Sequence, residues 1–206
     1  MDHARDTALT ADDVLHRLIE GNARYKAGQS RFTGLRPGML QDLAHGQQPI
    51  ATILGCADSR VPPELIFDAV LGELFVVRVA GNVLAPEVAA SLQYADTHLD
   101  TPLFVVLGHE GCGAIKAALE TQRAGATHAS RIQHLVEAIL PALADVDDAL
   151  DPVAQLAQAV EANVRWTMRL LAESPEGRAR LEAGRMMLIG AIYDLASGHV
   201  RLLDMR

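Results

Sequence analysis

The chain has 206 residues, of which 50% are hydrophobic and 21% are charged, so it is long enough to bury a core in one α/β domain. Its formal net charge of −8 argues against nucleic acid or an anionic membrane as a partner. The sequence has no apolar run of about 18 residues and no secretory leader pattern, and we therefore expect a cytoplasmic protein. Without repeats or linkers, we expect a single domain over residues 1–206.

The first part of the chain predicts an N-terminal helical arm. Apolar residues recur at helical spacing from Thr10 to about Ala27, and Thr10 is a suitable N-cap. Residues 28–37 are rich in Gly, Arg and Ser and have no period, which predicts an extended arm or loop. Residues 40–46 can form one short helix.

Continuous apolar runs predict four buried strands of a mainly parallel sheet. These runs span residues 50–56, 74–79, 103–108 and 186–193. The helical patterns between them imply right-handed βαβ units with helices on both faces of the sheet. Two of these helices are expected to start near Pro62 and Cys112, and four others to span residues 86–98, 131–143, 152–173 and 176–183. A turn over residues 194–198 predicts that residues 200–203 pair back as a short antiparallel edge strand.

Both cysteines of the chain lie in two short motifs, residues 56–60 (CADSR) and residues 109–113 (HEGCG). Each motif directly follows a predicted parallel strand. The carboxyl ends of parallel strands meet at one edge of the sheet, where open α/β folds bind their ligands. Because cytosolic thiols stay reduced, this pair of motifs favours metal binding or thiol chemistry over a structural disulfide.

Cys56, Cys112 and His109 together form a good zinc ligand set, and water or the Asp58 carboxylate can take the fourth position. Four protein ligands would make the site structural. Three ligands plus water would make a Lewis acid whose water ionises near pH 7, against about 15.7 in bulk. Arg60 can hold Asp58 away from the metal through a bidentate ion pair, which would keep the site open.

In four places the sequence resembles the β-class carbonic anhydrases, in the order in which that family carries its motifs. The matching stretches cover nearly the whole chain and are residues 56–64 (CADSRVPPE), 75–82 (FVVRVAGN), 108–114 (GHEGCGA) and 190–194 (GAIYD). The resemblance implies zinc on Cys56, His109 and Cys112. It also implies that Asp58 and Arg60 form the catalytic dyad beside the metal-bound water. Separately, the two-residue spacing of Cys56 and Asp58 suggests a closed form at acid pH in which Asp58 leaves Arg60 and becomes the fourth ligand.

The same resemblance implies a substrate pocket and an assembly. Gln47, which we expect at the start of the first strand, looks like the family glutamine that hydrogen-bonds substrate or bicarbonate. Phe75 and Tyr94 look like walls of an apolar carbon dioxide pocket. Gly113 lies at the start of a helix, where backbone amides can face an anion such as bicarbonate. Residues 1–46 correspond to an N-terminal helix and arm that wrap a second copy, so we expect a homodimer, with a tetramer left open.

One position departs from the regulated members of the family. Those members bind a regulatory bicarbonate through a Trp, an Arg and a Tyr. Arg78 and Tyr193 match two of these residues, but Ile53 stands where the Trp would be, which argues against regulation by bicarbonate.

The expected activity is therefore zinc-dependent, reversible hydration of carbon dioxide to bicarbonate and a proton, a carbonic anhydrase (lyase) reaction. Two alternatives remain open. The same site could hydrolyse carbon disulfide or carbonyl sulfide, which differ in pocket size and access more than in metal chemistry. A non-catalytic structural zinc or thiol-redox module would show no turnover, and its redox form would cycle a disulfide between Cys56 and Cys112.

Overall fold

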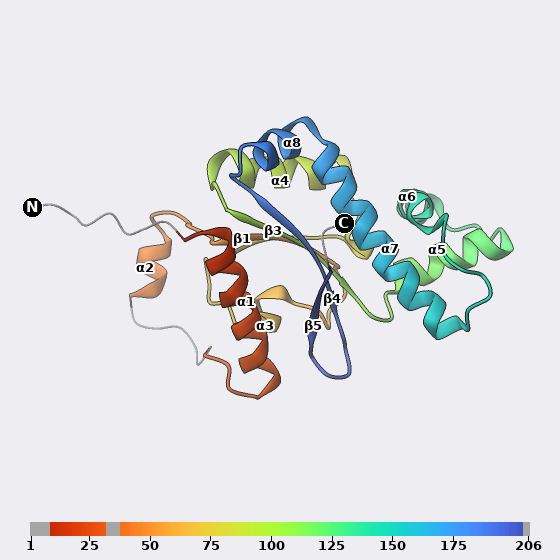
Figure 1. Cartoon of the computed structure of the whole chain (residues 1–206), viewed down its shortest axis with the longest axis horizontal. Helices are drawn as coiled ribbons and strands as arrows, with labels where there is room; N and C mark the ends of the chain where they lie inside the picture. The colour runs from red at the N-terminus through yellow and green to blue at the C-terminus, as the bar shows by residue number, and fades with distance from the viewer. Residues whose placement is uncertain (1–8, 32–37, 204–206) are drawn as a thin grey trace, which may run out of the picture.

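The computed structural model describes residues 9–31 and 38–203 and is built around a five-stranded sheet (Figure 1). The strand order is β2-β1-β3-β4-β5. The first four strands are parallel, and β5 runs antiparallel to β4 at the edge. The strands are β1 (Ala51–Gly55), β2 (Leu74–Arg78), β3 (Leu103–His109), β4 (Met187–Tyr193) and β5 (Val200–Leu203). The mainly parallel sheet with an antiparallel edge strand is confirmed.

The helices begin and end close to the residues predicted as their boundaries. They are α1 (Ala11–Lys26), α2 (Met39–Leu43), α3 (Pro63–Ile66), α4 (Pro86–His98), α5 (Gly113–Ala124), α6 (Ser130–Ile139), α7 (Pro152–Glu173) and α8 (Pro175–Glu182), with 3-10 turns η1 (Ala80–Asn82) and η2 (Leu140–Leu143). Thr10 caps α1 in a capping box with Asp13, as its sequence suggested. The helix predicted over residues 131–143 is instead divided into α6 and η2, because Pro141 lacks the amide hydrogen that an α-helix needs there.

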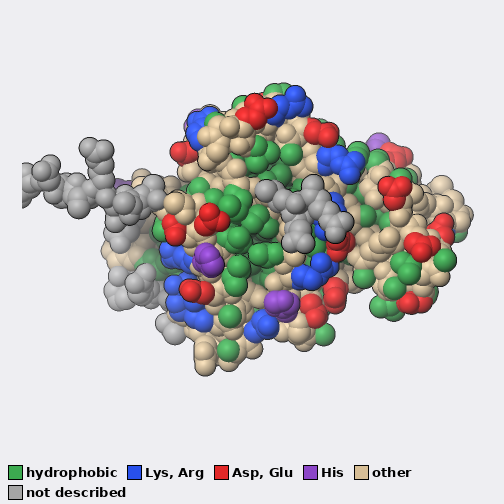
Figure 2. All heavy atoms as spheres, viewed as in Figure 1, with side chains coloured by type: hydrophobic (Ala, Val, Ile, Leu, Met, Phe, Trp, Pro, Cys, Tyr) green, Lys and Arg blue, Asp and Glu red, His purple; other side chains and the backbone are tan. Residues whose placement is uncertain are grey.

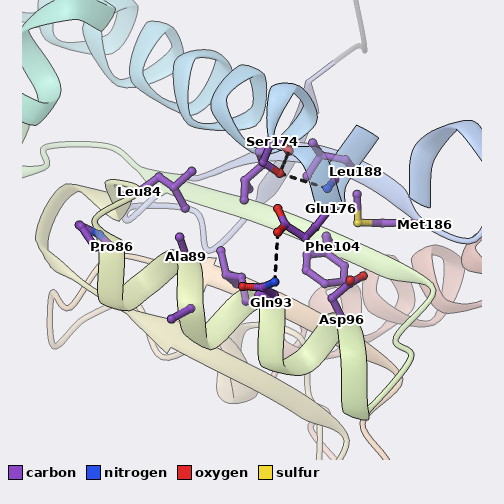
Figure 3. Close-up of a pocket in the computed structure, with 14 residues that line it drawn as sticks. Leu84, Pro86, Ala89, Gln93, Asp96, Phe104, Ser174, Glu176, Met186 and Leu188 are labelled. Carbon is purple, nitrogen blue, oxygen red and sulfur yellow. Dashed lines mark hydrogen bonds between the residues drawn. The ribbon is translucent and has the colours of Figure 1, made fainter. Parts of the chain in front are cut away.

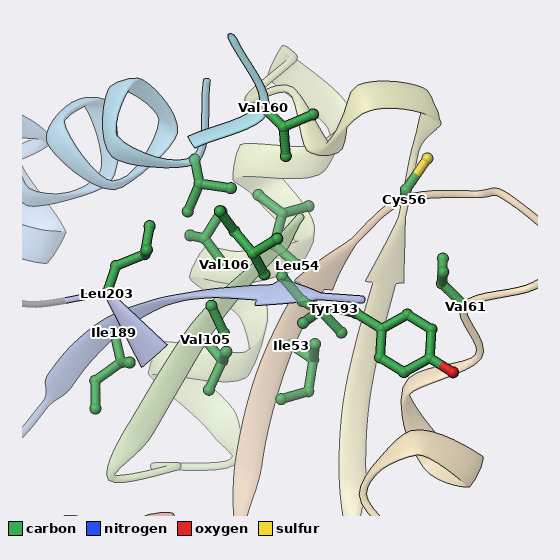
Figure 4. Close-up of a cluster of buried hydrophobic side chains, with 14 of the residues drawn as sticks. Ile53, Leu54, Cys56, Val61, Val105, Val106, Val160, Ile189, Tyr193 and Leu203 are labelled. Carbon is green, nitrogen blue, oxygen red and sulfur yellow. The ribbon is translucent and has the colours of Figure 1, made fainter. Parts of the chain in front are cut away.

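Helices cover both faces of the sheet. Alternate residues of a strand point to opposite faces. On β3, Val105 lines a small cavity with Leu15 and Leu18 of α1, whereas a Cβ added at Gly108 would meet Val164 of α7. Figure 4 shows the same two layers, with Ile53, Val105 and Ile189 on one side and Leu54 and Val106 with Val160 of α7 on the other. The core thus lies on both sides of β1, β3 and β4.

The prediction that residues 74–79 form a buried strand is wrong in one respect. The strand β2 exists, but its first four residues are only half-buried and Arg78 is exposed. The physical reason is its place at the edge of the sheet, where β1 is its single neighbour. An apolar, β-branched run suits an edge strand as well as a central one.

Buried polar contacts fix α1 to the remainder of the fold. Asn22 is 4% exposed and donates to the carbonyl oxygens of Ile66 (3.1 Å) and Gly198 (2.9 Å). Its Oδ1 accepts from the Val200 amide at 3.0 Å. The buried carboxylate of Asp68 receives Arg24 Nε at 2.6 Å and the Arg31 amide at 2.7 Å. These contacts hold the described part of the N-terminal region; the predicted arm residues 32–37 lie outside the described residues.

The surface that Figure 2 shows is mixed, with acidic and basic side chains around a band of hydrophobic ones beside α1. Ile19 of α1 is 44% exposed and Leu202 of β5 is 37% exposed. None of the helices within residues 9–31 and 38–203 combines the length and the apolar character that a bilayer crossing requires.

Candidate metal centre

Three buried side chains converge at the carboxyl edge of the sheet. Cys56 directly follows β1, His109 ends β3, and Cys112 is the N-cap of α5. Since β1 and β3 are adjacent, residues more than fifty positions apart become neighbours. The ligand atoms of Cys56, His109 and Cys112 all lie within 4.8 Å of one another. Gly111, at φ 64°, makes the tight turn that carries the chain from His109 back to Cys112.

The donor atoms fit a metal ion. His109 Nδ1 lies 2.9 Å from the Glu110 carbonyl oxygen, which can only accept, so Nδ1 carries the proton and Nε2 keeps its lone pair. Buried Nε2 has no hydrogen-bond partner among the described residues, an expensive arrangement unless a metal ion occupies its lone pair. Two sulfurs and one imidazole nitrogen are the ligands that zinc prefers.

The thiol environment favours loss of a proton from Cys56. A hydrogen bond with the Cys112 thiol, 4.0 Å between the sulfurs, lowers the pKa of Cys56 to about 4, although burial opposes this. The backbone amides of Asp58 and Gly81 also donate to Cys56 Sγ, each at 3.4 Å. The pKa of Cys112 is raised by its hydrogen bond with Cys56 and by burial. These directions favour a thiolate at Cys56 and a thiol at Cys112 in the metal-free chain, and a bound cation would favour loss of the second proton.

Asp58 points to Arg60. Oδ1 accepts from the Arg60 amide and from Nε, both at 2.9 Å, and Oδ2 accepts from Nη2 at 2.7 Å. These bonds from Arg60 hold the pKa of Asp58 well below its ordinary value, against a smaller opposing effect of burial. A carboxylate offers about four acceptor positions. Three are filled, which leaves one position on Oδ2 that no described residue occupies.

A polar network lies behind the ligands, and of its members only Arg78 stood out in the sequence, in another role. Arg78 donates from Nε to the Cys56 carbonyl oxygen at 2.8 Å and from Nη2 to that of Asp58. Asn163 of α7 donates to the Gly81 carbonyl oxygen at 2.8 Å, and Thr167 donates to that of Asn82 at 3.3 Å. Both side chains are buried. In the sequence, Asn163 and Thr167 are a polar pair four residues apart on an otherwise apolar helix face, and this pattern could have indicated a buried polar contact.

The predicted substrate residues are less well gathered than the ligands. Gln47 does not start the first strand, because β1 begins at Ala51 and Gln47 lies exposed in the preceding segment. Phe75 and Tyr94 contact each other, with ring centroids 6.2 Å apart, but Tyr94 is 49% exposed. Gly113 begins α5, with open space where a Cβ would lie. The roles of these four residues stay predictions.

The residues compared with the regulatory bicarbonate site are engaged within the chain. Ile53 is fully buried, and the Tyr193 hydroxyl lies 3.2 Å from that of Tyr25. Burial and this contact raise the pKa of Tyr193 to about 12.

Three possible metal ligands at the carboxyl edge of a mainly parallel sheet are typical of an α/β metalloenzyme. Comparisons with known proteins identify the family within this class. The family model described as Carbonic anhydrase matches residues 51–200. Carbonic anhydrase 2 of Mycobacterium tuberculosis is 40% identical over 189 residues, which cover 91% of this chain and 90% of the relative. The carbonic anhydrase of Mycolicibacterium smegmatis is 36% identical over 190 residues, which cover 90% of this chain and 89% of the relative.

A solved structure agrees. The β-carbonic anhydrase of Coccomyxa, in complex with acetazolamide, superposes with a TM-score of 0.73 at 27% identity, covering 92% of this chain and 86% of that one. The chain therefore belongs to the β-class carbonic anhydrases, and its reaction is the reversible hydration of carbon dioxide.

Proposed function

We propose that this carbonic anhydrase works with one zinc ion held by Cys56, His109 and Cys112. The observation that carries the proposal is the set of three donor atoms within 4.8 Å of one another, with Nε2 of His109 buried and unpartnered among the described residues. Zinc there would supply a Lewis acid that lowers the pKa of water from about 15.7 to about 7, a magnitude known for carbonic anhydrases and not worked out from this structure.

Asp58 and Arg60 act as an orienting dyad in this proposal. Arg60 fixes the carboxylate through one backbone and two side-chain bonds. The free acceptor position on Oδ2 can then receive the hydrogen of the reacting water, which turns the oxygen lone pair toward carbon dioxide. In a closed form without this ion pair, Asp58 would be the fourth ligand and the enzyme would be inactive.

The substrate pocket is proposed to be completed by a second copy of the chain. Gln47, Phe75, Tyr94 and Gly113 are the proposed substrate residues, and Gln47 and Tyr94 are exposed in the single chain. Leu65 and Leu71, which follow the first motif, are 51% and 46% exposed, as expected where a partner covers them. We place the protein in the cytoplasm as one domain, with residues 1–46 as the dimerisation arm and Ile53 disfavouring bicarbonate regulation.

The test combines metal analysis with stopped-flow hydration assays. Purified protein should contain one zinc per chain and hydrate carbon dioxide. Asp58→Asn should keep the zinc but lower kcat/KM by about 10²-fold or more, because the amide nitrogen cannot accept a hydrogen bond. Cys112→Ser should lose both zinc and activity. Full activity in Asp58→Asn would remove the dyad assignment, and activity without bound metal would remove the zinc assignment.

The alternative functions give different outcomes in the same experiment. Faster turnover of carbon disulfide or carbonyl sulfide than of carbon dioxide would identify a hydrolase on the same ligands. Zinc without turnover of any of these substrates, or a reversible Cys56–Cys112 disulfide seen by mass spectrometry, would identify a structural or redox module. Sedimentation velocity on the zinc-loaded protein tests the dimer.

A further inference from the structure

A separate cavity lies between α4 and the start of α8 (Figure 3). Its volume is about 230 Å³ and it is partly open to solvent. An apolar protein cavity of roughly 150 Å³ is already large enough to bind benzene. The inner wall is apolar, with Leu92, Phe104, Leu171, Met186 and Leu188 among its residues. None of the residues of the metal centre lines it.

The rim of this cavity is acidic. Glu176 of α8 is exposed, and its Oε1 accepts a hydrogen bond from Gln93 Nε2 of α4 at 3.1 Å. Figure 3 shows this bond crossing from one helix to the other. The described lining residues contain no Lys, Arg or His. The one described partner of the Glu176 carboxylate is thus a neutral amide.

The second carboxylate that lines the cavity, that of Asp96, already has a cationic partner. Asp96 lines it, but Arg180 Nε lies 2.6 Å from its Oδ1, and Arg180 also reaches Asp100 at 2.9 Å. Burial raises the pKa of Asp96, as expected for a carboxylate beside an apolar wall. At the start of α8, the Ser174 hydroxyl oxygen accepts from the Gly177 amide at 3.1 Å, so this amide does not offer an anion site. Glu176, in the first turn of α8, is thus the lining carboxylate that no cationic side chain among the described residues pairs with.

We propose that this cavity binds a small primary amine with an apolar body, taken up as its ammonium ion. The hydrocarbon part would displace water from the apolar wall. The ammonium group would donate to the Glu176 carboxylate at the mouth, where Gln93 donates in the free protein. A carboxylate or phosphate at the same place would face Glu176 and be repelled. The site is distinct from the metal centre and does not depend on the hydration reaction.

The direct test uses 2-phenylethylamine as the probe and the methionine methyl groups as reporters. Zinc-loaded, full-length protein is labelled with ¹³C at its methionine methyls, and Met186→Leu assigns the Met186 signal. We expect a saturable shift of Met186 with a Kd of about 0.1–1 mM, typical of a ligand of this size. The neutral 2-phenylethanol should bind about three- to fivefold more weakly, and 3-phenylpropanoate should not saturate. Amine on the metal would leave the Met186 signal in place.

Two variants separate the apolar and the charged parts of the site. Ala89→Leu on α4 fills the cavity and should weaken amine binding at least about tenfold; Thr97→Leu, on the same helix but outside the lining, is its matched control. Glu176→Gln, at an exposed position, should reduce the amine affinity to that of the alcohol. No saturable shift of Met186 by about 10 mM amine, or an unchanged affinity in Ala89→Leu, would overturn the site. Equal binding of amine and alcohol would overturn the ammonium contact.

Discussion

Gly108 offers a sharp test of how the sheet positions the metal ligands. It precedes His109 on β3, and an added Cβ would lie 2.6 Å from Val164 Cγ2 and 3.4 Å from Val160 Cγ1 of α7. Val164 is fully buried, and a β-branched side chain in a helix has one strongly preferred rotamer. Gly108→Ala must therefore push α7 from the sheet or shift His109. We expect a loss of about 2 kcal/mol in the free energy of unfolding.

The compensating change is Val164→Ala. Alone, it removes two buried methyl groups and should cost about 2 kcal/mol. Combined with Gly108→Ala, it makes room for the new methyl group, so the double variant should be about 2 kcal/mol more stable than the sum of the single losses predicts. Urea denaturation of the zinc-loaded proteins measures this, and metal retention under a chelator should fall in Gly108→Ala and recover in the double variant.

Gly55→Ala is the matched control, because Gly55 precedes the ligand Cys56 as Gly108 precedes His109. Its added Cβ would meet Pro63 Cγ at 3.7 Å, an ordinary contact. We expect this variant to be neutral or more stable by up to about 1 kcal/mol. Two results would refute the proposed contact between β3 and α7. One is an equal free energy of unfolding for Gly108→Ala and Gly55→Ala; the other is a double variant whose loss equals the sum of the losses in Gly108→Ala and Val164→Ala.

Three further predictions concern buried polar groups. Asn163→Ala removes the bond to the Gly81 carbonyl, so zinc should pass to a chelator faster and stability should fall by about 1–3 kcal/mol; an unchanged release rate would contradict this. Asn22→Ala leaves two buried backbone groups and one partly buried one without a partner and should cost about 3 kcal/mol in urea denaturation, whereas a loss under about 1 kcal/mol would show that water replaces the amide. Burial alone would raise the pKa of Asp68, but bonds from Arg24 and Arg31 lower it below its ordinary value. The ionised Asp68 carboxylate therefore stabilises the fold fully above its unfolded pKa of about 3.9, and this stabilisation is lost as the pH falls through the lower folded pKa. Asp68→Asn should be less stable at neutral pH and show a flatter decline toward acid, and an equal decline in both proteins would contradict the assignment.

Local patterns sufficed for the elements that carry the site. Continuous apolar runs located β1, β3 and β4, and prolines marked the first residues of α4 and α7. The scarcity of cysteine drew attention to Cys56 and Cys112, and the strand ends explained how they meet. The three donors that sequence alone favoured are the ones the fold gathers.

Features that depend on distant partners were not predictable in this way. The edge position of β2 follows from strand order, which an apolar run does not encode. Asn163 bonds to a carbonyl oxygen 82 residues away, and Asn22 to one 176 residues away. The sequence shows at most a polar residue on an apolar helix face, and it does not reveal which distant carbonyl oxygen that residue meets. The exposure of Gln47 and Tyr94 could likewise not be read from the resemblance, and their proposed roles require the second copy that we propose to complete the pocket.

The strand order also has a consequence for how the protein acquires its metal. Cys56 and His109 become neighbours only after the crossover through β2 and α4 has closed, and such non-local parallel pairing is slow. Before that point, the chain offers a metal only local pairs of ligands, such as His109 with Cys112 or Cys56 with Asp58. We therefore expect the sheet to form first and the metal to be captured last, unlike zinc fingers, whose folding the metal drives. Protein made under metal starvation should then accumulate in a folded, metal-free form that becomes active when zinc is added.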